Sequence, residues 1–239
     1  MPGAVMAGVV GKPDRDGAPQ VSPRRPRADA VRNRVALLAA AQTLYAERGI
    51  DVPLEEIAKQ AGVGIATLYR NFPRGKVQLV SEATVGQVTR SVDVARAALT
   101  IPDPWQGFVT FVEEICAMQE GDAGFRDVLV TMLPGDERVD ELRRQGHELA
   151  IELTERAKAT GKLRSDVVHQ DLLLLLVANA AVLTATRRDA PDASRRLVAL
   201  FLDAVGTRWQ RSTLPDPPTD QEMFQAMTRL ATTRGCVSD

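Results

Sequence analysis

The sequence predicts an all-α protein, and three observations carry that prediction. From Ala28 onward, apolar residues recur at the three- and four-residue spacing of an amphipathic helix. Glycine and proline interrupt this pattern at intervals of one helix length, as at Gly49, Pro73 and Pro102. No segment shows the alternation of a strand, an internal repeat or a strand–helix–strand unit. The chain of 239 residues, 44% of them hydrophobic, is long enough to bury a core in one or two domains.

The expected elements follow from these interruptions. Residues 1–27 are rich in Gly, Pro and Arg without periodicity, so we expect a disordered arm. Helices are expected at 28–48, 54–61, 65–71, 76–99, 105–120, 125–133, 136–158, 170–187, 193–209 and, with a weaker pattern, 220–230. Gly49 and Gly161 end helices, Gly121 and Gly124 separate two of them, and Pro134 begins another break.

Charge is distributed unevenly along the chain. Residues 1–80 carry 12 Lys and Arg against 7 Asp and Glu, whereas the remainder carries 18 against 24, for a net charge of −1. This distribution fits a nucleic-acid reader joined to a separate module, and it also fits ordinary fluctuation. The two cysteines lack metal-ligand spacing, and the first residues lack a basic leader. The longest apolar stretch, 172–186, is shorter than a membrane span. We therefore expect a cytoplasmic protein with no membrane partner.

The segment 54–71 has the pattern of two short helices joined by a sharp turn. One apolar stripe runs along the first helix: Leu54, Ile57, Ala58 and Ala61. Gly62 permits the positive φ that such a turn needs, and Val63 and Leu68 can pack back on the first helix. This periodicity also fits a helical hairpin buried in a bundle. We expect Arg70 and Asn71 to project outward beside Tyr69, which favours instead a helix that enters a DNA major groove.

The segment 54–76, LEEIAKQAGVGIATLYRNFPRGK, closely resembles the DNA-binding signature of the TetR family of ligand-responsive transcriptional repressors. With its flanking helices, the resemblance covers about residues 28–80. It implies a three-helix helix-turn-helix domain over 28–80 and double-stranded DNA as a partner. The contact residues it implies are Gly64, Ile65, Ala66, Thr67, Tyr69, Arg70, Asn71 and Lys76. Lys76 opens the next helix, where free N–H groups favour a phosphate.

Two of these positions depart from the family pattern. Gly64 stands where the family often has Ser or Thr, so a hydroxyl cap and its phosphate contact are missing. Ile65 replaces a commonly polar residue and is expected to touch thymine methyl groups. Just before the first helix, Arg27 lies near where the DNA backbone or minor groove would pass. An arm that contacts DNA and an inert tail both remain open.

The resemblance implies that residues 81–212 form a helical ligand-binding and dimerisation bundle, followed by a tail (213–239) with a weak helix. Residues 172–177 are six apolar residues in a row, and a helix that is apolar all round must be covered on all sides. A four-helix interface between two copies of the chain would cover this helix. A fully buried position in the centre of a monomer would cover it equally well. The expected interface residues are Leu172, Leu176, Leu183, Val198, Phe201, Val205 and Trp209.

A ligand pocket is the least specified part of the prediction. The candidate lining residues are Trp105, Phe108, Phe111, Met118, Phe125, Met132, His147 and Asn179, and aromatic and Met residues at helical spacing also fit plain core. Asn179 would hydrogen-bond either a ligand or its own symmetry mate. His147 lies in a polar stretch and also fits a solvated position.

The sequence thus predicts a homodimeric, sequence-specific repressor on a pseudo-palindromic operator, released by a small, mostly apolar ligand. An activator or global regulator with the same DNA-binding unit is the first alternative, and an α-helical small-molecule-binding enzyme is a remote one. Two histidines leave little metal or triad chemistry, and the glycine-containing turn 62–67 lacks the third glycine of a dinucleotide loop. We therefore expect no enzymatic activity, metal or cofactor.

Overall fold

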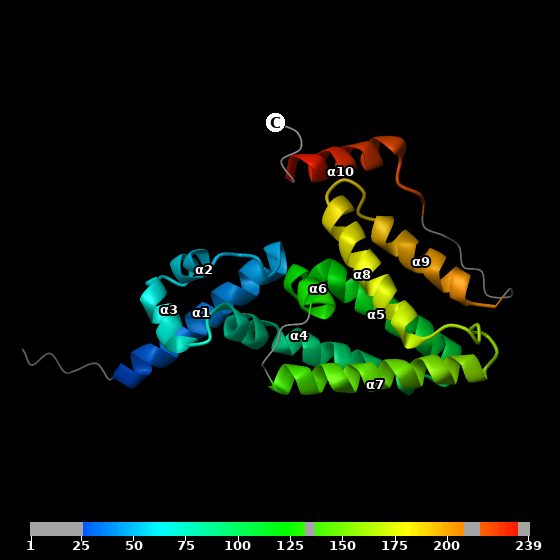
Figure 1. Cartoon of the computed structure of the whole chain (residues 1–239), viewed down its shortest axis with the longest axis horizontal. Helices are drawn as coiled ribbons and strands as arrows, with labels where there is room; N and C mark the ends of the chain where they lie inside the picture. The colour runs from blue at the N-terminus through cyan, green and yellow to red at the C-terminus, as the bar shows by residue number, and fades with distance from the viewer. Residues whose placement is uncertain (1–25, 132–136, 208–215, 234–239) are drawn as a thin grey trace, which may run out of the picture.

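The computed structural model describes residues 26–131, 137–207 and 216–233, and these form ten helices without a strand (Figure 1). The all-α prediction is confirmed. The helices are α1 (Pro26–Arg48), α2 (Leu54–Gln60), α3 (Ile65–Asn71), α4 (Lys76–Leu99), α5 (Pro104–Gly121), α6 (Ala123–Val130), α7 (Glu137–Ala159), α8 (His169–Thr186), α9 (Ala193–Val205) and α10 (Asp220–Thr233). The arm to residue 25, Met132 and Trp209 lie outside the described residues.

Helix α6 differs from the expected 125–133. It begins two residues earlier because the carboxylate of Asp122 accepts a hydrogen bond from the Phe125 N–H at 2.8 Å, which caps the helix at Ala123. Gly124 therefore lies inside α6 and does not separate helices. A Cβ at Gly124 would lie 2.9 Å from the Cβ of Tyr45, so the missing side chain lets α6 approach α1 closely. The sequence pattern indicated that Gly124 separates two helices, but in the structure its role is to allow close packing of α6 on α1.

Helices α1, α2 and α3 pack at one end of the molecule around a core that the first turns of α4 complete (Figure 1). The fully buried members of this core include Leu37, Tyr45, Ile57, Leu68 and Phe72. Burial raises the pKa of the Tyr45 phenol, whose oxygen has no hydrogen-bond partner within the described residues.

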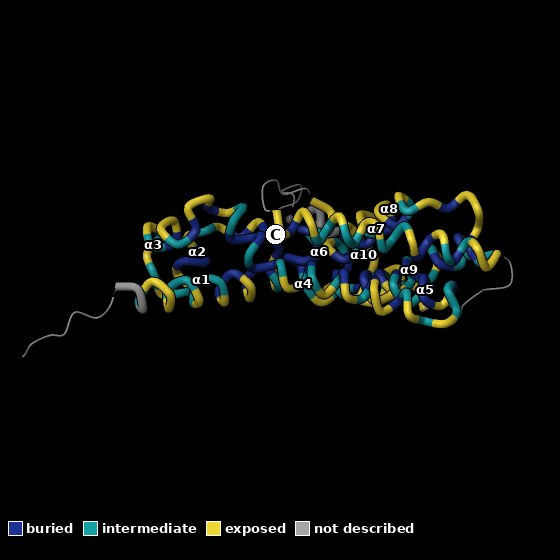
Figure 2. The backbone as a smooth tube through the Cα atoms, turned by 90° about the horizontal axis from the view of Figure 1, so that it is seen from below, coloured by how far each residue is buried: buried dark blue, intermediate teal, exposed yellow. Residues whose placement is uncertain are grey.

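Helix α4 is shared by both halves of the molecule. Its first turns place Leu79 and Val80 in the core of the α1–α3 unit, while it lies beside α5 and α7 in the body. Figure 2 shows buried stretches continuing from this unit into the bundle, with exposed residues along the outside. Because α4 is one uninterrupted helix, its tilt is common to both halves.

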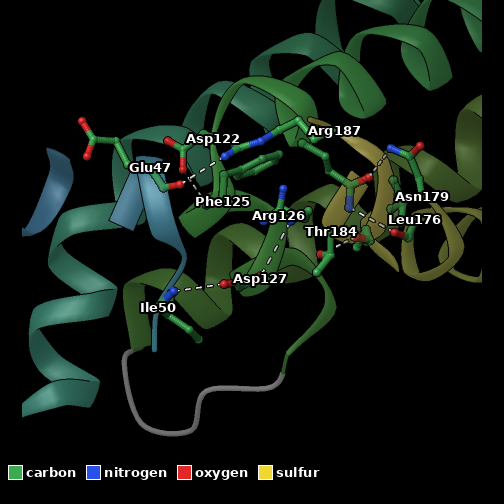
Figure 3. A network of polar contacts seen from close by, with 12 residues as sticks. Glu47, Ile50, Asp122, Phe125, Arg126, Asp127, Leu176, Asn179, Thr184 and Arg187 are labelled. Atoms are coloured by element: carbon green, nitrogen blue, oxygen red, sulfur yellow. Dashed lines mark hydrogen bonds and ion pairs between the residues drawn. The ribbon is translucent and has the colours of Figure 1, made fainter. Parts of the chain in front are cut away.

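A buried polar network joins three helices of the body, and Figure 3 labels two of its members on α8, Leu176 and Asn179. The Asn179 amide in α8 donates to Gln119 Oε1 at 2.9 Å, and Asn179 Oδ1 accepts from the Ser194 hydroxyl at 2.7 Å. Gln119 in turn donates to the Leu176 carbonyl at 3.1 Å. These bonds tie α5, α8 and α9 together and already occupy the Asn179 amide within one subunit, so neither a ligand nor a symmetry mate is needed to satisfy it.

Helix α8 is long and apolar enough, by length and composition alone, to cross a bilayer. It contacts α5, α6, α9 and α10, which is the arrangement of a helix inside a bundle, but part of its outer face remains exposed. This helix is the single membrane-span candidate found in the part of the chain that the structure describes.

Replacing Gly107 by alanine should destabilise the protein. Helix α5 crosses α4 at Gly107, where an added Cβ would lie 2.6 Å from the carbonyl oxygen of Ala98, a backbone atom that moves only if α4 bends. We expect the free energy of unfolding to fall by about 1–3 kcal/mol, measured by urea denaturation. Gly86→Ala in α4 is the matched control, because an added Cβ there meets no atom within 4 Å and alanine favours a helix. Equal stability of the two variants would contradict close packing at this crossing.

Candidate DNA interface and candidate ligand cavity

The α2–α3 turn has the geometry of a helix-turn-helix. Gly62 adopts φ 69°, and the Val63 N–H donates to the Ala58 carbonyl at 3.0 Å, which closes the turn. Leu68 on α3 and Ile57 on α2 are both fully buried between the helices. These contacts fix the direction in which α3 projects from the unit.

The outer face of α3 presents exposed polar and small side chains. Ala66, Tyr69 and Arg70 are exposed, and Gly64, Ile65 and Thr67 at the start of the helix are exposed or half-buried. The guanidinium of Arg70 donates to the Ala66 carbonyl at 3.2 Å and leaves its other N–H groups facing outward. Asn71 is half-buried, and its amide donates to the Thr67 carbonyl at 2.8 Å.

Arg34 fixes the end of α3, a role that the sequence did not predict. Its guanidinium donates to the Asn71 carbonyl at 2.5 Å, pairs with Glu82 on α4 and lies 4.5 Å from the centre of the Phe72 ring. One side chain of α1 thus holds α3 and α4 together. Spacing along the chain could not reveal it, because its partners are 37 and 48 residues away.

Helix α4 begins beside this face. Gly75 adopts φ 59° directly before Lys76, and a Cβ there would lie 3.3 Å from the ring of Tyr69. The ammonium of Lys76 lies 3.2 Å from the carboxylate of fully exposed Asp51, an ion pair that water screens strongly. Lys76 therefore lies beside α3, exposed and able to change partner.

A second candidate site is a partly open cavity of about 220 Å³ in the body, lined by residues of α4 to α8. Its lining is mostly aliphatic: Val88, Ser91, Ala95, Phe111, Val112, Ile115, Cys116, Val128, Leu129, Leu142, Arg143, Gly146, His147, Ala150, His169, Leu172, Leu173, Leu175 and Leu176. Burial raises the pKa of the Cys116 thiol to about 12, so this cysteine stays protonated and contributes only apolar surface.

Of the expected lining residues, the structure brings Phe111 and His147 to this cavity. Trp105 and Phe108 stack on each other, 5.9 Å between ring centres, in the core formed with α8 and α9. Phe125 is fully buried in α6, and Met118 is half-buried on α5 outside the lining. The sequence missed His169 and the aliphatic residues of α4 and α7, since aliphatic side chains at helical spacing resemble ordinary core.

The short helix α6 lies between the cavity and the α1–α3 unit. Val128 is buried in the core of that unit and also lines the cavity, as does Val88 on α4. Beside it, the carboxylate of Asp127 accepts a hydrogen bond from the Ile50 N–H at 3.0 Å, in the loop after α1 (Figure 3). From α8, Arg187 reaches the Glu47 carbonyl at 3.5 Å. Two adjacent residues of α6 thus join the α1–α3 unit to the body, and one of them, Val128, also lines the cavity.

The end of α6 is held from the other side by Arg143 on α7. Its guanidinium donates to the carbonyl oxygens of Val128 and Thr131, each at 3.1 Å, and lies 3.6 Å from the carboxylate of Asp140. A side chain of the cavity wall therefore fixes the position of α6 relative to α7.

The outer faces of α8 and α9 carry exposed apolar side chains. Leu174 is 67% exposed, and Val177 and Leu200 are also exposed around a shallow groove that includes Ala178 and Phe201. Among the expected interface residues, Leu172, Leu183, Val198 and Val205 are instead buried within the subunit, and Leu176 and Phe201 are half-buried. Since an α-helix turns about 100° per residue, the exposed stripe lies one or two positions from the expected one.

Two protein-family models match the chain. The model described as bacterial regulatory proteins, tetR family, matches residues 37–83, and the model described as transcriptional regulator SbtR-like, C-terminal domain, matches residues 103–206. Together they span more than half of the chain. No curated protein sequence matches it.

Several solved structures are similar. The TetR transcriptional regulator SCO0520 from Streptomyces coelicolor is 31% identical, with 73% of this chain and 99% of that chain covered and a TM-score of 0.49. PfmR from Thermus thermophilus is 22% identical, with 73% and 99% covered and a TM-score of 0.55. RolR in complex with resorcinol is 18% identical, with 80% and 98% covered and a TM-score of 0.50. The last two likenesses support the shared fold.

Removing Arg70 and removing Lys76 should weaken DNA binding in different ways. Arg70 has outward N–H groups on α3 and can bond the O6 and N7 atoms of guanine, so Arg70→Ala should cost about 1–3 kcal/mol per contact and relax preference at one base pair per half-site. Lys76 at the start of α4 should hold a phosphate, so Lys76→Ala should weaken all sequences equally and reduce the salt slope by about one per half-site.

Affinities on the operator and on a randomised duplex, measured by fluorescence anisotropy over a salt series, separate the two roles. Glu55→Gln, on the exposed side of α2, is the control for a change of charge nearby. If Arg70→Ala weakens both duplexes in equal proportion, Arg70 holds the backbone and specificity must come from other residues of α3.

Proposed function

The chain belongs to the TetR family of bacterial transcriptional regulators, and from that premise we propose that it is a homodimeric repressor released from its operator by a small, mostly apolar ligand. The helix-turn-helix of α2 and α3 is the DNA-binding unit of this regulator. The observation that carries the proposal of ligand release is that one wall of the cavity, at Val88 and Val128, is also part of the core of the DNA-binding unit.

DNA recognition would divide between α3 and the start of α4. Arg70, Tyr69 and Ala66 lie on the exposed face of α3 and would meet base edges and phosphates, and Lys76 would exchange Asp51 for a phosphate. Two copies of α3 in successive major grooves must lie about 34–36 Å apart. A fixed spacing of this kind makes DNA affinity depend on the relative tilt of the two α4 helices.

Release would follow from crowding between α4, α6 and α7. A ligand in the cavity contacts Val88 on α4 and Val128 on α6, and both side chains also fill the DNA-binding core. A ligand needs to favour the displaced conformation by only about 1–3 kcal/mol per site to act as a useful switch. RolR, which shares the fold, was solved with resorcinol, and this supports a small organic molecule as the occupant here.

The proposed dimer would cover the exposed stripe on α8 and α9. Leu174, Val177 and Leu200 are exposed on adjacent helices around an apolar groove, and contiguous apolar surface of this kind marks interaction sites in soluble proteins. A two-fold axis through the groove would bring the same stripe of a second copy onto it. Four helices, two from each subunit, would then form one apolar core.

Placing a charge on this stripe should give monomers. We expect Leu174→Asp to sediment as a monomer at micromolar concentration and to lose most of its operator affinity, because an unpaired carboxylate cannot be buried at low cost. Val35→Asp, at a similarly exposed valine on α1, is the control for sedimentation and should remain dimeric. A monomeric wild-type protein at this concentration would rule out the proposed dimer.

Enlarging the cavity wall should change induction without changing DNA binding in the absence of ligand. We expect Phe111→Trp to shift the inducer concentration at half-release at least about fivefold, because the added ring occupies space that the ligand needs. Phe224→Trp, at an exposed position on α10, is the matched control and should behave as wild type. The release is measured on operator DNA identified by genome-wide footprinting. If no small apolar compound changes DNA affinity or melting temperature, the proposed ligand release fails.

A further inference from the structure

The ionisable groups of the cavity are, apart from the protonated Cys116 thiol, all basic. Among its described lining residues, Arg143, His147 and His169 can carry positive charge, and there is no Asp or Glu. Arg143 and His147 are one turn apart on α7, and His169 opens α8 opposite them. The basic groups therefore gather where α7 meets the start of α8, in a cavity whose lining is otherwise mostly apolar.

The two imidazoles lie at the edge of the cavity, where His169 is half-buried and His147 is exposed to solvent, and both can be reached by a ligand. Their ring centres are 4.5 Å apart and the rings are nearly perpendicular, at 84°. Neither ring forms a hydrogen bond within the part of the chain that the structure describes, although each neutral imidazole has one N–H donor and one acceptor. Arg143, by contrast, is occupied by two carbonyl oxygens and Asp140, so it contributes charge to this side of the cavity while its position stays fixed.

The size of the cavity limits the apolar part of the ligand. An apolar cavity of about 150 Å³ accepts benzene. The 220 Å³ found here accommodates one substituted ring or a short aliphatic chain, and a long acyl chain would have to extend out of the open side of the cavity. Phe111 offers an aromatic surface to such a ring, and Leu172 and Leu176 on α8 add apolar surface to the lining.

We infer that the cavity selects a small organic acid of about one ring, whose carboxylate or acidic hydroxyl group lies against His147 and His169 while its apolar body fills the space beside Phe111. The imidazole N–H groups donate to the acid, and Arg143 adds favourable charge. A cationic ligand of the same size would meet only basic groups. This inference deepens the proposed function and rests on it for the regulatory consequence, but binding itself can be measured without DNA.

The experiment is isothermal titration calorimetry on the full-length protein with probes of matched size. Benzoate should bind at least about tenfold more tightly than benzyl alcohol, because a hydrogen bond to a charged group is worth more than a neutral one, and benzylamine should bind most weakly. Hexadecanoate, which exceeds the cavity, should bind far more weakly than benzoate. The double variant H147F/H169F should lose the preference for the acid while still binding toluene.

Two further variants make the result decisive. The variant H147Q/H169Q keeps an N–H donor at each position and changes the side-chain volume less, so it should keep part of the preference for benzoate over benzyl alcohol. It replaces H147F/H169F in the test if that variant folds poorly. Arg144→Gln removes a positive charge from α7 outside the cavity lining and should keep the full preference. If benzyl alcohol binds as tightly as benzoate, if the histidine variants keep the preference unchanged, or if none of the probes binds, the inference is wrong.

Operator release separates this inference from the proposed function. Neutral probes that bind as well as benzoate and release DNA would overturn acid selection and leave the ligand-released repressor standing. Selective binding of benzoate without any loss of DNA affinity would support acid selection, and would contradict release through this cavity.

Discussion

The eight residues of α6 are the constraint on which the rest of this structure depends. Asp127 is bonded to the backbone after α1, whereas the next residue, Val128, fills both the core of the DNA-binding unit and the cavity wall. A side chain at Gly49 would displace the Asp127 carboxylate from this contact, since a Cβ there would overlap it. The helix therefore cannot move relative to the body without pulling on the end of α1 or changing the packing of two cores.

This contact carries an electrostatic cost. Burial raises the pKa of the Asp127 carboxyl and lowers that of the neighbouring Arg126 guanidinium, because both charged forms lose hydration. Two nitrogen atoms of Arg126 are buried without a hydrogen-bond partner in the described residues, and its ion pair with Asp127 is long, at 3.9 Å. An unsatisfied buried donor costs about 1–3 kcal/mol, the same size as a typical coupling free energy between two sites. In the proposed mechanism, a conformation that rehydrates Arg126 would offset part of the free energy that a ligand has to supply.

The sequence predicted the local elements well and the contacts between them poorly. The α2–α3 turn was predictable because its geometry depends on neighbouring residues: an apolar stripe, Gly62 and two residues that pack back. The role of Arg34 was not, because it joins α1 to α3 and α4 across 37 or more residues. Gly124 was interpreted as a break because the close approach of Tyr45, which explains a glycine inside α6, depends on tertiary packing.

The cavity was predicted less well for a related reason, since aliphatic periodicity is the same for a cavity wall as for a filled core. On α8, six consecutive apolar residues indicate burial on all sides without saying which side faces inward, and the structure buries Leu172 but exposes Leu174.

The length of α4 bears on the proposed coupling between the cavity and DNA. A helix of 24 residues is about 36 Å long, so a tilt of about 5° moves its far end by about 3 Å. Hydrogen bonds to base edges tolerate only a few tenths of an ångström, and a dimer must satisfy two half-sites at one spacing. Val88 and Ala95 lie along α4 in the cavity wall, while Lys76 begins the same helix beside α3. In the proposed mechanism, a side-chain displacement at the cavity would be amplified through the rigid helix α4 into a mismatch with the spacing of the two half-sites.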